Sequence, residues 1–251
     1  MVAKSQKKGA KMQLKVFKNY QEMSKYASQI VLDVVAKNPQ CTLGFATGST
    51  PLGLYDYLKQ ACKDGMSFKS VSAFNLDEYV GLDASHPQSY KYFMQHNLFK
   101  GLDILPQNCH IPCGVATDLQ AECQNYSKQL AKHTIALQIL GIGGNGHIAF
   151  NEPGTSFQST THVVQLSPKT IADNARFFDS IDQVPTSALT MGIGEIMKAQ
   201  CVLVLANGKN KAQAVFNMVK GPISTNCPAS VLQTHPNCIV VCDEESASLL
   251  N

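Results

Sequence analysis

The chain has 251 residues, of which 44% are hydrophobic and 16% charged, a composition that suits one α/β domain with an ordinary apolar core. No apolar run reaches the roughly 18 residues of a membrane-spanning helix, and the start lacks the apolar segment of a secretion signal, so we expect a cytoplasmic protein with no membrane partner. The net charge is +3, but residues 1–11 hold four lysines and no acid, and the rest of the chain carries −1. We therefore expect a basic disordered tail over 1–11 and no nucleic-acid partner.

Nine cysteines are present, and none forms a CxxC pair with the histidine spacing of a zinc site. Several lie in or beside apolar runs, where a free thiol behaves as a small hydrophobic side chain. The sequence therefore predicts reduced thiols and no metal site.

Short apolar runs alternate with helical stretches along residues 12–251. Strands are predicted at 41–46, 71–76, 135–142, 201–206 and 238–242, and helices between them include 51–61, 89–99, 119–131 and 209–219. Most of the strand runs are apolar throughout, which is typical of strands buried on both faces of a sheet. The alternation predicts a single α/β domain with a doubly wound, mainly parallel, Rossmann-like sheet flanked by helices. Ligands bind such sheets beyond the carboxyl ends of the strands.

The first predicted strand is followed by Thr47, Gly48, Ser49, Thr50 and Pro51, and then by a helix. Ser49 and Thr50 are good helix caps, and Pro51 suits a first helical turn. Free backbone N–H groups, hydroxyls and the positive end of a helix dipole together suit a phosphate group. The spacing and lysine of a Walker P-loop are missing. An ordinary capped turn is the alternative interpretation.

The second predicted strand, 71–76, is followed by Asp77, Glu78 and Tyr79. Neighbouring side chains in a strand face opposite ways, so one carboxylate could serve as a base in a crevice while the other is structural. A surface acidic turn is the alternative.

The third predicted strand leads into GIGGNGHIAFNEPG at 141–154. A dinucleotide site would need a helix here and an acid about 20 residues later, and the sequence has neither, so we interpret the glycines as a tight loop that a substrate approaches closely. The segment presents the amide of Asn145, the imidazole of His147 and the carboxylate of Glu152 within eight residues. The carboxylate can orient and polarise the ring, which indicates acid–base chemistry more than a surface histidine does.

Two further segments offer cations. Lys209 and Lys211 follow the fourth predicted strand at the start of a helix, where either could meet an anion or simply be solvated. Arg176 stands among apolar residues at 174–178, which indicates a placed anion ligand.

Taken together, these segments resemble the glucosamine-6-phosphate deaminase family, also described as glucosamine/galactosamine-6-phosphate isomerases. The resemblance covers residues 12–245 and rests on TGSTP at 47–51, FNLDEYVGL at 74–82, SYKYFM at 89–94, GIGGNGHIAFNEPG at 141–154, ARFF at 175–178 and VCDE at 241–244. The pair FNLDEY and GHIAFNEP is specific, because the related 6-phosphogluconolactonases generally lack the combination. The resemblance implies a fold of the sugar-phosphate isomerase type.

The resemblance also implies a reaction: D-glucosamine 6-phosphate gives D-fructose 6-phosphate and ammonia. His147 would open the sugar ring, with Glu152 and Asn145 setting its charge and orientation, and Asp77 would then remove the C2 proton. Asn145 replaces an aspartate of some members, so we expect it to position groups and not to act as a base.

By the same resemblance, Thr47–Thr50, Arg176 and Lys211 would hold the phosphate, and no metal or organic cofactor would be needed. A lid would span about 162–178. The allosteric members carry cations shortly after NEP that this chain lacks, so we expect a monomer or small homo-oligomer that N-acetylglucosamine 6-phosphate does not activate. A lactonase, a sugar-phosphate sensor without turnover and a nicotinamide dehydrogenase are the alternatives.

Overall fold

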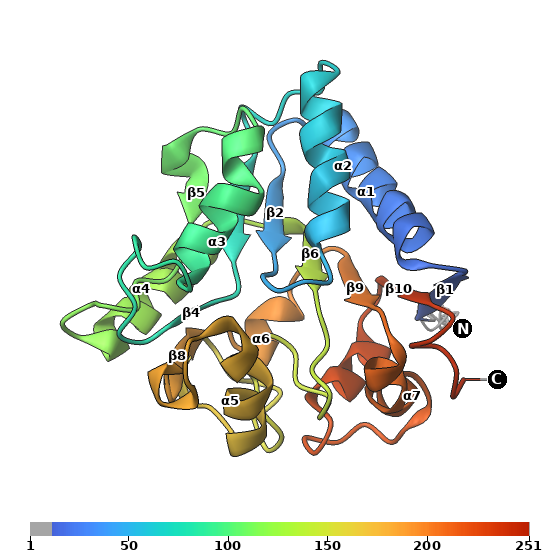
Figure 1. The fold of residues 1–251 in the computed structure, drawn as a ribbon. Helices are drawn as coiled ribbons and strands as arrows, with labels where there is room; N and C mark the ends of the chain where they lie inside the picture. The colour runs from blue at the N-terminus through green and yellow to red at the C-terminus, as the bar shows by residue number, and fades with distance from the viewer. Residues whose placement is uncertain (1–11, 251) are drawn as a thin grey trace, which may run out of the picture.

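The fold is described for residues 12–250 by a computed structural model, so the expected tail at 1–11 lies outside the described residues. Within that range, seven strands form one parallel sheet in the order β1-β10-β9-β6-β2-β3-β5. Their bounds are β1 Gln13–Phe17, β2 Thr42–Phe45, β3 Ser72–Asn75, β5 Cys109–His110, β6 Ile135–Leu140, β9 Val202–Ala206 and β10 Cys238–Asp243. Figure 1 shows β1 and β10 at one edge and β5 towards the other.

The helices connect the strands. Their bounds are α1 Tyr20–Lys37, α2 Leu52–Lys63, α3 Tyr90–Asn97, α4 Leu119–Leu130, α5 Pro168–Asn174, α6 Ile193–Ile196 and α7 Ala212–Lys220. Shorter 3₁₀ turns lie at Phe99–Gly101, Pro106–Asn108, Ala175–Phe177, Ile181–Gln183, Lys209–Lys211 and Pro228–Thr234. No helix among the described residues is long and apolar enough to cross a membrane.

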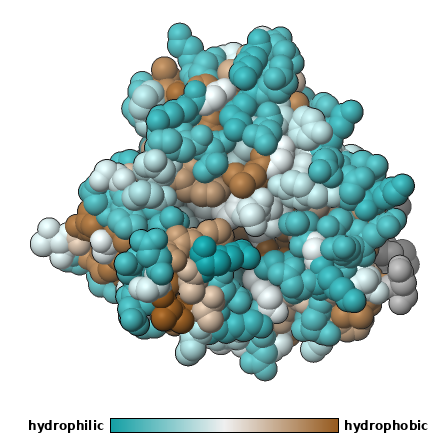
Figure 2. All heavy atoms as spheres, viewed as in Figure 1, coloured by the Kyte–Doolittle hydropathy of each residue, from teal (hydrophilic) through white to brown (hydrophobic). Residues whose placement is uncertain are grey.

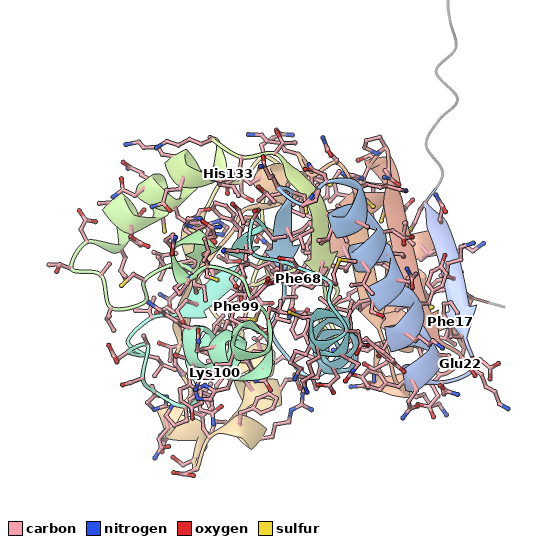
Figure 3. All side chains as sticks on the ribbon, turned by 90° about the horizontal axis from the view of Figure 1, so that it is seen from above. Phe17, Glu22, Phe68, Phe99, Lys100 and His133 are labelled. Atoms are coloured by element: carbon pink, nitrogen blue, oxygen red, sulfur yellow. The ribbon has the colours of Figure 1, made fainter. Side chains whose placement is uncertain are left out.

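Helices cover both faces of the sheet. On one face, Phe45 of β2 packs edge-on against Tyr55 of α2 and against Phe99 just after α3. On the other, Phe74 of β3 packs against Tyr126 of α4. Figure 3 accordingly places Phe99 and His133, which follows α4, on opposite sides of the sheet. This architecture confirms the predicted doubly wound, mainly parallel α/β fold, and its central strands are buried and largely apolar.

In the centre of this sheet, the side chain of Gln138 lies directly against the backbone of Gly44. Gly44 of β2 pairs with Gln138 of β6, and the fully buried side chain of Gln138 lies where a Cβ on Gly44 would be. A glycine is therefore required at this position, because any side chain would collide with the glutamine amide.

A second, three-stranded antiparallel sheet was not predicted. It consists of β4 Asp77–Tyr79, β8 Ser187–Thr190 and β7 His162–Gln165, in the order β4-β8-β7. β4 has only three residues and begins two residues after β3 ends, so the sequence shows a single apolar run with polar residues behind it. Thr190 of β8 pairs with Asp77 on one side and with His162 on the other.

Candidate active site

A cleft of about 500 Å³ opens at the carboxyl ends of β2, β3, β6 and β9, where doubly wound sheets bind ligands. In the space-filling view a hollow lies in the middle of this face, between α2 and α3 above and α5 and α7 below (Figure 2). The cleft is lined by eight of the residues predicted from the sequence: Thr47, Gly48, Ser49, Thr50, Asp77, His147, Arg176 and Lys211. The remaining two, Asn145 and Glu152, do not line the cleft but contact each other beside His147.

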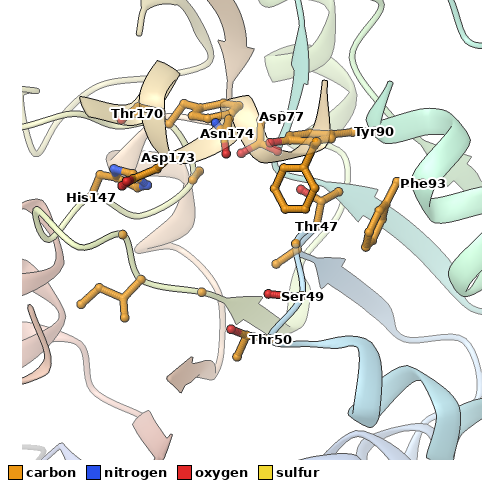
Figure 4. Close-up of a pocket in the computed structure, with 18 of the residues that line it drawn as sticks. Thr47, Ser49, Thr50, Asp77, Tyr90, Phe93, His147, Thr170, Asp173 and Asn174 are labelled. Atoms are coloured by element: carbon orange, nitrogen blue, oxygen red, sulfur yellow. The ribbon is translucent and has the colours of Figure 1, made fainter. Parts of the chain in front are cut away.

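The loop from Thr47 to Thr50 connects β2 to α2 (Figure 4). Gly48 has φ +97°, a left-handed conformation that favours glycine. The prediction that Ser49 and Thr50 cap α2 is wrong: Pro51 occupies the N-cap position and no side chain caps the helix. The Thr50 hydroxyl instead donates to Asn207 Oδ1 at 2.7 Å. The Gly53 N–H in the first turn of α2 is bound by the hydroxyl of Tyr20 and not by a side chain of the loop.

Two cations, Arg176 and Lys211, line the cleft. Among the described residues, the side chains of Arg176 and Lys211 have no hydrogen bond or ion pair; Arg176 lies over the ring of Phe177, 4.7 Å from its centre. Burial lowers the pKa of Lys211, Asp173 opposes this effect, and the nearby positive charges add to it. Cations with no protein partner in a cleft are suited to bind an anion.

The two adjacent carboxylates separate as the alternation of a strand requires. Asp77 is buried against the cleft, and burial, followed by the charge of Glu78, raises its pKa to about 8. Glu78 points the other way and accepts backbone N–H groups from Tyr79, Tyr90 and Lys91, each at 2.9 Å. Glu78 therefore fixes the start of α3, while Asp77 lines the cleft.

His147 is held by the glycine loop and backed by a carboxylate. Its ring lies over Gly143, where a Cβ would come within 2.3 Å of Nε2, so only glycine fits beneath it. Its Nδ1 lies 3.7 Å from Glu152 Oε2. Asn145 Nδ2 donates to the same oxygen at 2.7 Å, and Asn145 Oδ1 accepts the backbone N–H of His147.

Glu152 is fixed by the segment that leads into α5. Ser167 Oγ donates to Glu152 Oε1 at 3.2 Å, and the Thr170 hydroxyl donates to the same oxygen. Burial alone would raise the pKa of Glu152, but the interactions with His147, Thr170 and Asn145 outweigh it and lower the pKa to about 2. Glu152 therefore places a carboxylate next to Nδ1 of His147, an arrangement that suits acid–base chemistry.

The cleft residues that were not singled out from the sequence include Tyr90, Asp173 and Asn207. Tyr90 lies close to Asp77 and Thr47 in the close-up, and Asp173 lies close to His147 (Figure 4). The SYKYFM segment was the only signal for Tyr90, and Asn207 directly precedes the glycine and lysines that the sequence did mark. No sequence feature marked Asp173 as a cleft residue, because its position depends on how α5 packs over the cleft.

The described residues contain no group of three or more histidine, cysteine or acidic side chains able to hold a metal ion. All nine cysteines are free thiols. For the buried thiols Cys41, Cys201 and Cys238, burial raises the pKa, to about 12 in the case of Cys238. Such thiols pack as apolar side chains.

Comparison with known proteins places this cleft in a family. Residues 18–241 match the family of glucosamine-6-phosphate isomerases and 6-phosphogluconolactonases. The chain is 52% identical over 234 residues to a glucosamine-6-phosphate deaminase of Thermoanaerobacter pseudethanolicus, covering 92% of both chains. It is 48% identical over 241 residues to the deaminase of Halothermothrix orenii, covering 95% of this chain and 100% of the relative.

Solved structures agree. A monomeric glucosamine-6-phosphate deaminase superposes with a TM-score of 0.93 at 44% identity, covering 95% of this chain and 100% of that chain. A 6-phosphogluconolactonase from Trypanosoma brucei reaches 0.81 at 20% identity, covering 96% and 99%, which shows a shared fold. The fold and cleft thus define an enzyme of the doubly wound α/β class. The chain belongs to the glucosamine-6-phosphate isomerase/6-phosphogluconolactonase family, which confirms the resemblance carried by its motifs.

Proposed function

We propose that the protein converts D-glucosamine 6-phosphate and water to D-fructose 6-phosphate and ammonia. The observation that carries the proposal is the placement of two acid–base groups in one cleft with unpaired cations. Asp77, with a pKa raised to about 8, and His147, backed by Glu152, both line a cleft that also presents Arg176 and Lys211. The deaminase relatives are similar to this chain over nearly its whole length.

Binding comes first in the proposed reaction. The phosphate occupies the space between the Thr47–Thr50 loop, Arg176 and Lys211, where backbone N–H groups and two cations offset its charge. The sugar then extends along the cleft towards Asp77 and His147. Ring opening moves a proton from the anomeric hydroxyl to the ring oxygen through His147, and Glu152 stabilises the imidazolium in between.

Isomerisation follows in the open-chain form. Asp77 removes the proton from C2, the electrons shift towards the C1 carbonyl, and an enolamine forms. Return of a proton to C1 gives an imine at C2, which water hydrolyses to the ketone and ammonia. The raised pKa of Asp77 suits a group that must both take and return a proton near neutral pH.

The assay of choice measures ammonia and fructose 6-phosphate in parallel from purified protein given glucosamine 6-phosphate without added metal or cofactor. Equal amounts of the two products would support the proposal. Hydrolysis of 6-phosphogluconolactone, with no ammonia from the amino sugar, would identify a lactonase instead. Binding without turnover of either substrate would identify a sensor.

We also propose that residues 162–178 act as a lid. The segment holds β7 and α5 and contributes Thr170, Asp173 and Arg176 to the cleft. Hydrogen exchange of the segment should slow when a sugar phosphate binds; equal exchange with and without ligand would contradict a lid.

A monomer or small homo-oligomer without activation by N-acetylglucosamine 6-phosphate remains our proposal for the assembly. The similarity to a monomeric deaminase supports it. Sigmoidal kinetics relieved by N-acetylglucosamine 6-phosphate would contradict the absence of activation.

A further inference from the structure

The hydroxyl of Tyr20 joins the first helix to the loop that begins α2. Tyr20 Oη lies 3.1 Å from Ser49 O and 3.0 Å from Thr50 O, and it can donate to either carbonyl. It also accepts the backbone N–H of Gly53 at 2.8 Å. A single hydroxyl thus serves two peptide carbonyls and one amide of the same turn.

The surrounding residues fix Tyr20 in this place. It is the first residue of α1, and Asn19 caps that helix by accepting the N–H of Glu22 at 2.9 Å. α1 and α2 pack closely side by side (Figure 1). Gly53 allows this approach, because a Cβ there would come within 2.6 Å of Ser24 Oγ and 3.0 Å of Tyr20 Cε1.

The loop is braced at its other end as well. The hydroxyl of the fully buried Tyr55 donates to the carbonyl of Ala46, the last residue before Thr47. Residues 47–50 are therefore held at one end by Tyr55 and at the other by Tyr20. Because α2 has no side-chain cap, the Gly53 N–H that a cap would satisfy is bonded to Tyr20.

We infer that Tyr20 is a positioning residue for the anion site, holding the peptide groups of Ser49 and Thr50 so that the loop fits a phosphate. The inference rests on the proposed function only in naming a sugar phosphate as the natural ligand. Tyr20 does not line the cleft, so it acts through the loop and not by contact with the ligand.

The test removes the hydroxyl alone. Tyr20→Phe is compared with a control, Tyr26→Phe, on the same helix. Tyr26 packs on Phe17, and its hydroxyl has no hydrogen bond among the described residues. For Tyr20→Phe, the Kd of inorganic phosphate, measured by calorimetry, and the KM of glucosamine 6-phosphate should both rise about three- to tenfold, the equivalent of losing one net hydrogen bond. The kcat should stay within about twofold, because uniform binding is lost and the acid–base groups are untouched. Tyr26→Phe should leave all three values unchanged.

A merely structural role would lower the melting temperature of Tyr20→Phe and leave the Kd of phosphate at its wild-type value, and that result would overturn the inference. A fall in kcat with unchanged KM would overturn it too, since the hydroxyl would then serve the chemical step. The phosphate measurement does not depend on turnover. If wild-type protein released no ammonia, the proposed function would fail while the comparison of phosphate Kd values still tested Tyr20.

Discussion

Thr50 Oγ1 and Asn207 Oδ1 are joined by a 2.7 Å hydrogen bond between loops that lie 157 residues apart in the chain. Asn207 is followed by Gly208, whose N–H is bound by the carboxylate of Asp243 at 3.0 Å. The bond therefore ties the Thr47–Thr50 loop to the turn that carries Lys211. It thereby connects the two strand ends that form the proposed phosphate site.

Replacing Asn207 by alanine should separate the two loops. We expect the KM for glucosamine 6-phosphate to rise about three- to tenfold, because one partly buried hydrogen bond is lost and the Thr50 hydroxyl is freed to rotate. Steady-state kinetics should show kcat within about twofold of wild type. Asn217→Ala is the control, since Asn217 bonds only Gln213 on the far part of α7. An unchanged KM for Asn207→Ala would show that the loops keep their positions without this bond.

Asp77→Asn should remove the proposed base while keeping the shape of the cleft. We expect kcat to fall about 10²–10⁴-fold, the usual contribution of general acid–base catalysis. The Kd of inorganic phosphate, measured by calorimetry, should be unchanged, because Asp77 is not among the residues proposed to hold the phosphate. Asp83→Asn, at an exposed loop position, provides the control. Near-normal turnover in Asp77→Asn would assign the base to another residue.

The pH dependence of activity should follow Asp77. Its pKa is raised from 3.8 to about 8, chiefly by burial, and the base must be ionised to act. The kcat/KM should therefore rise with pH and level off above about 8, as the group loses its proton. Glu152, with its pKa lowered to about 2, stays a carboxylate through this range. A flat profile between pH 6 and pH 9 would contradict the assignment.

The raised pKa of Asp77 also predicts how the stability of the fold depends on pH. Between the unfolded value of 3.8 and the folded value of about 8, the folded protein holds a proton on Asp77 that the unfolded chain has released. Raising the pH through this window therefore destabilises the fold. The asparagine of Asp77→Asn does not titrate, so the variant escapes this loss. The melting temperature of Asp77→Asn minus that of wild type should therefore increase from pH 5 to pH 8. A constant difference across that range would show that Asp77 does not titrate as inferred.

The carboxylate of Asp173 should weaken the binding of anions in the wild-type protein. It is a carboxylate at the mouth of the cleft, and its charge acts on Lys211. Because its side chain is exposed, we expect a modest effect: Asp173→Asn should tighten inorganic phosphate about two- to fourfold at low salt and less at high salt. Asp179→Asn removes the same charge from an exposed position outside the cleft and serves as the control.

A different result for Asp173→Asn would point to another role. If the Kd of phosphate stayed the same while glucosamine 6-phosphate bound more weakly, Asp173 would contact the amino group of the substrate. Fructose 6-phosphate lacks that group, so its binding should then be unchanged by the substitution.

The parallel sheet and most of its strands could be predicted because buried parallel strands are apolar throughout, as at 201–206 and 238–242. The edge strand β1 and helix α1 were not among the predicted elements. No residue of Gln13–Phe17 is fully buried, which explains why this strand gave no apolar run. β4, β7 and β8 were missed for a related reason. They have three or four residues each, and β7 is only partly buried.

Of the candidate site, the residues at strand ends could be predicted, because parallel strands bring their carboxyl ends to one edge. Strand alternation predicted that Asp77 and Glu78 would face different surroundings, and the choice of Asp77 as the proposed base came from the family resemblance. The bond between Thr50 and Asn207 could not be predicted, since it depends on the placement of two loops by separate strands. The capping of α2 was wrong because a tertiary contact with Tyr20 replaced the local one.

The central position of Thr190 in the small sheet limits how the cleft can open. Asp77 and His162 are paired to the same residue from opposite sides, so the proposed base and the first strand of the proposed lid belong to one hydrogen-bonded ladder. A lid that swung from His162 would have to break that ladder and displace Asp77 with it. If residues 162–178 act as the proposed lid, β7 and Leu166, whose N–H bonds Thr186 O, form its fixed end. The moving part would then be α5 with Arg176, and its opening would break the hydrogen bonds from Ser167 and Thr170 to Glu152 while leaving Asp77 in place.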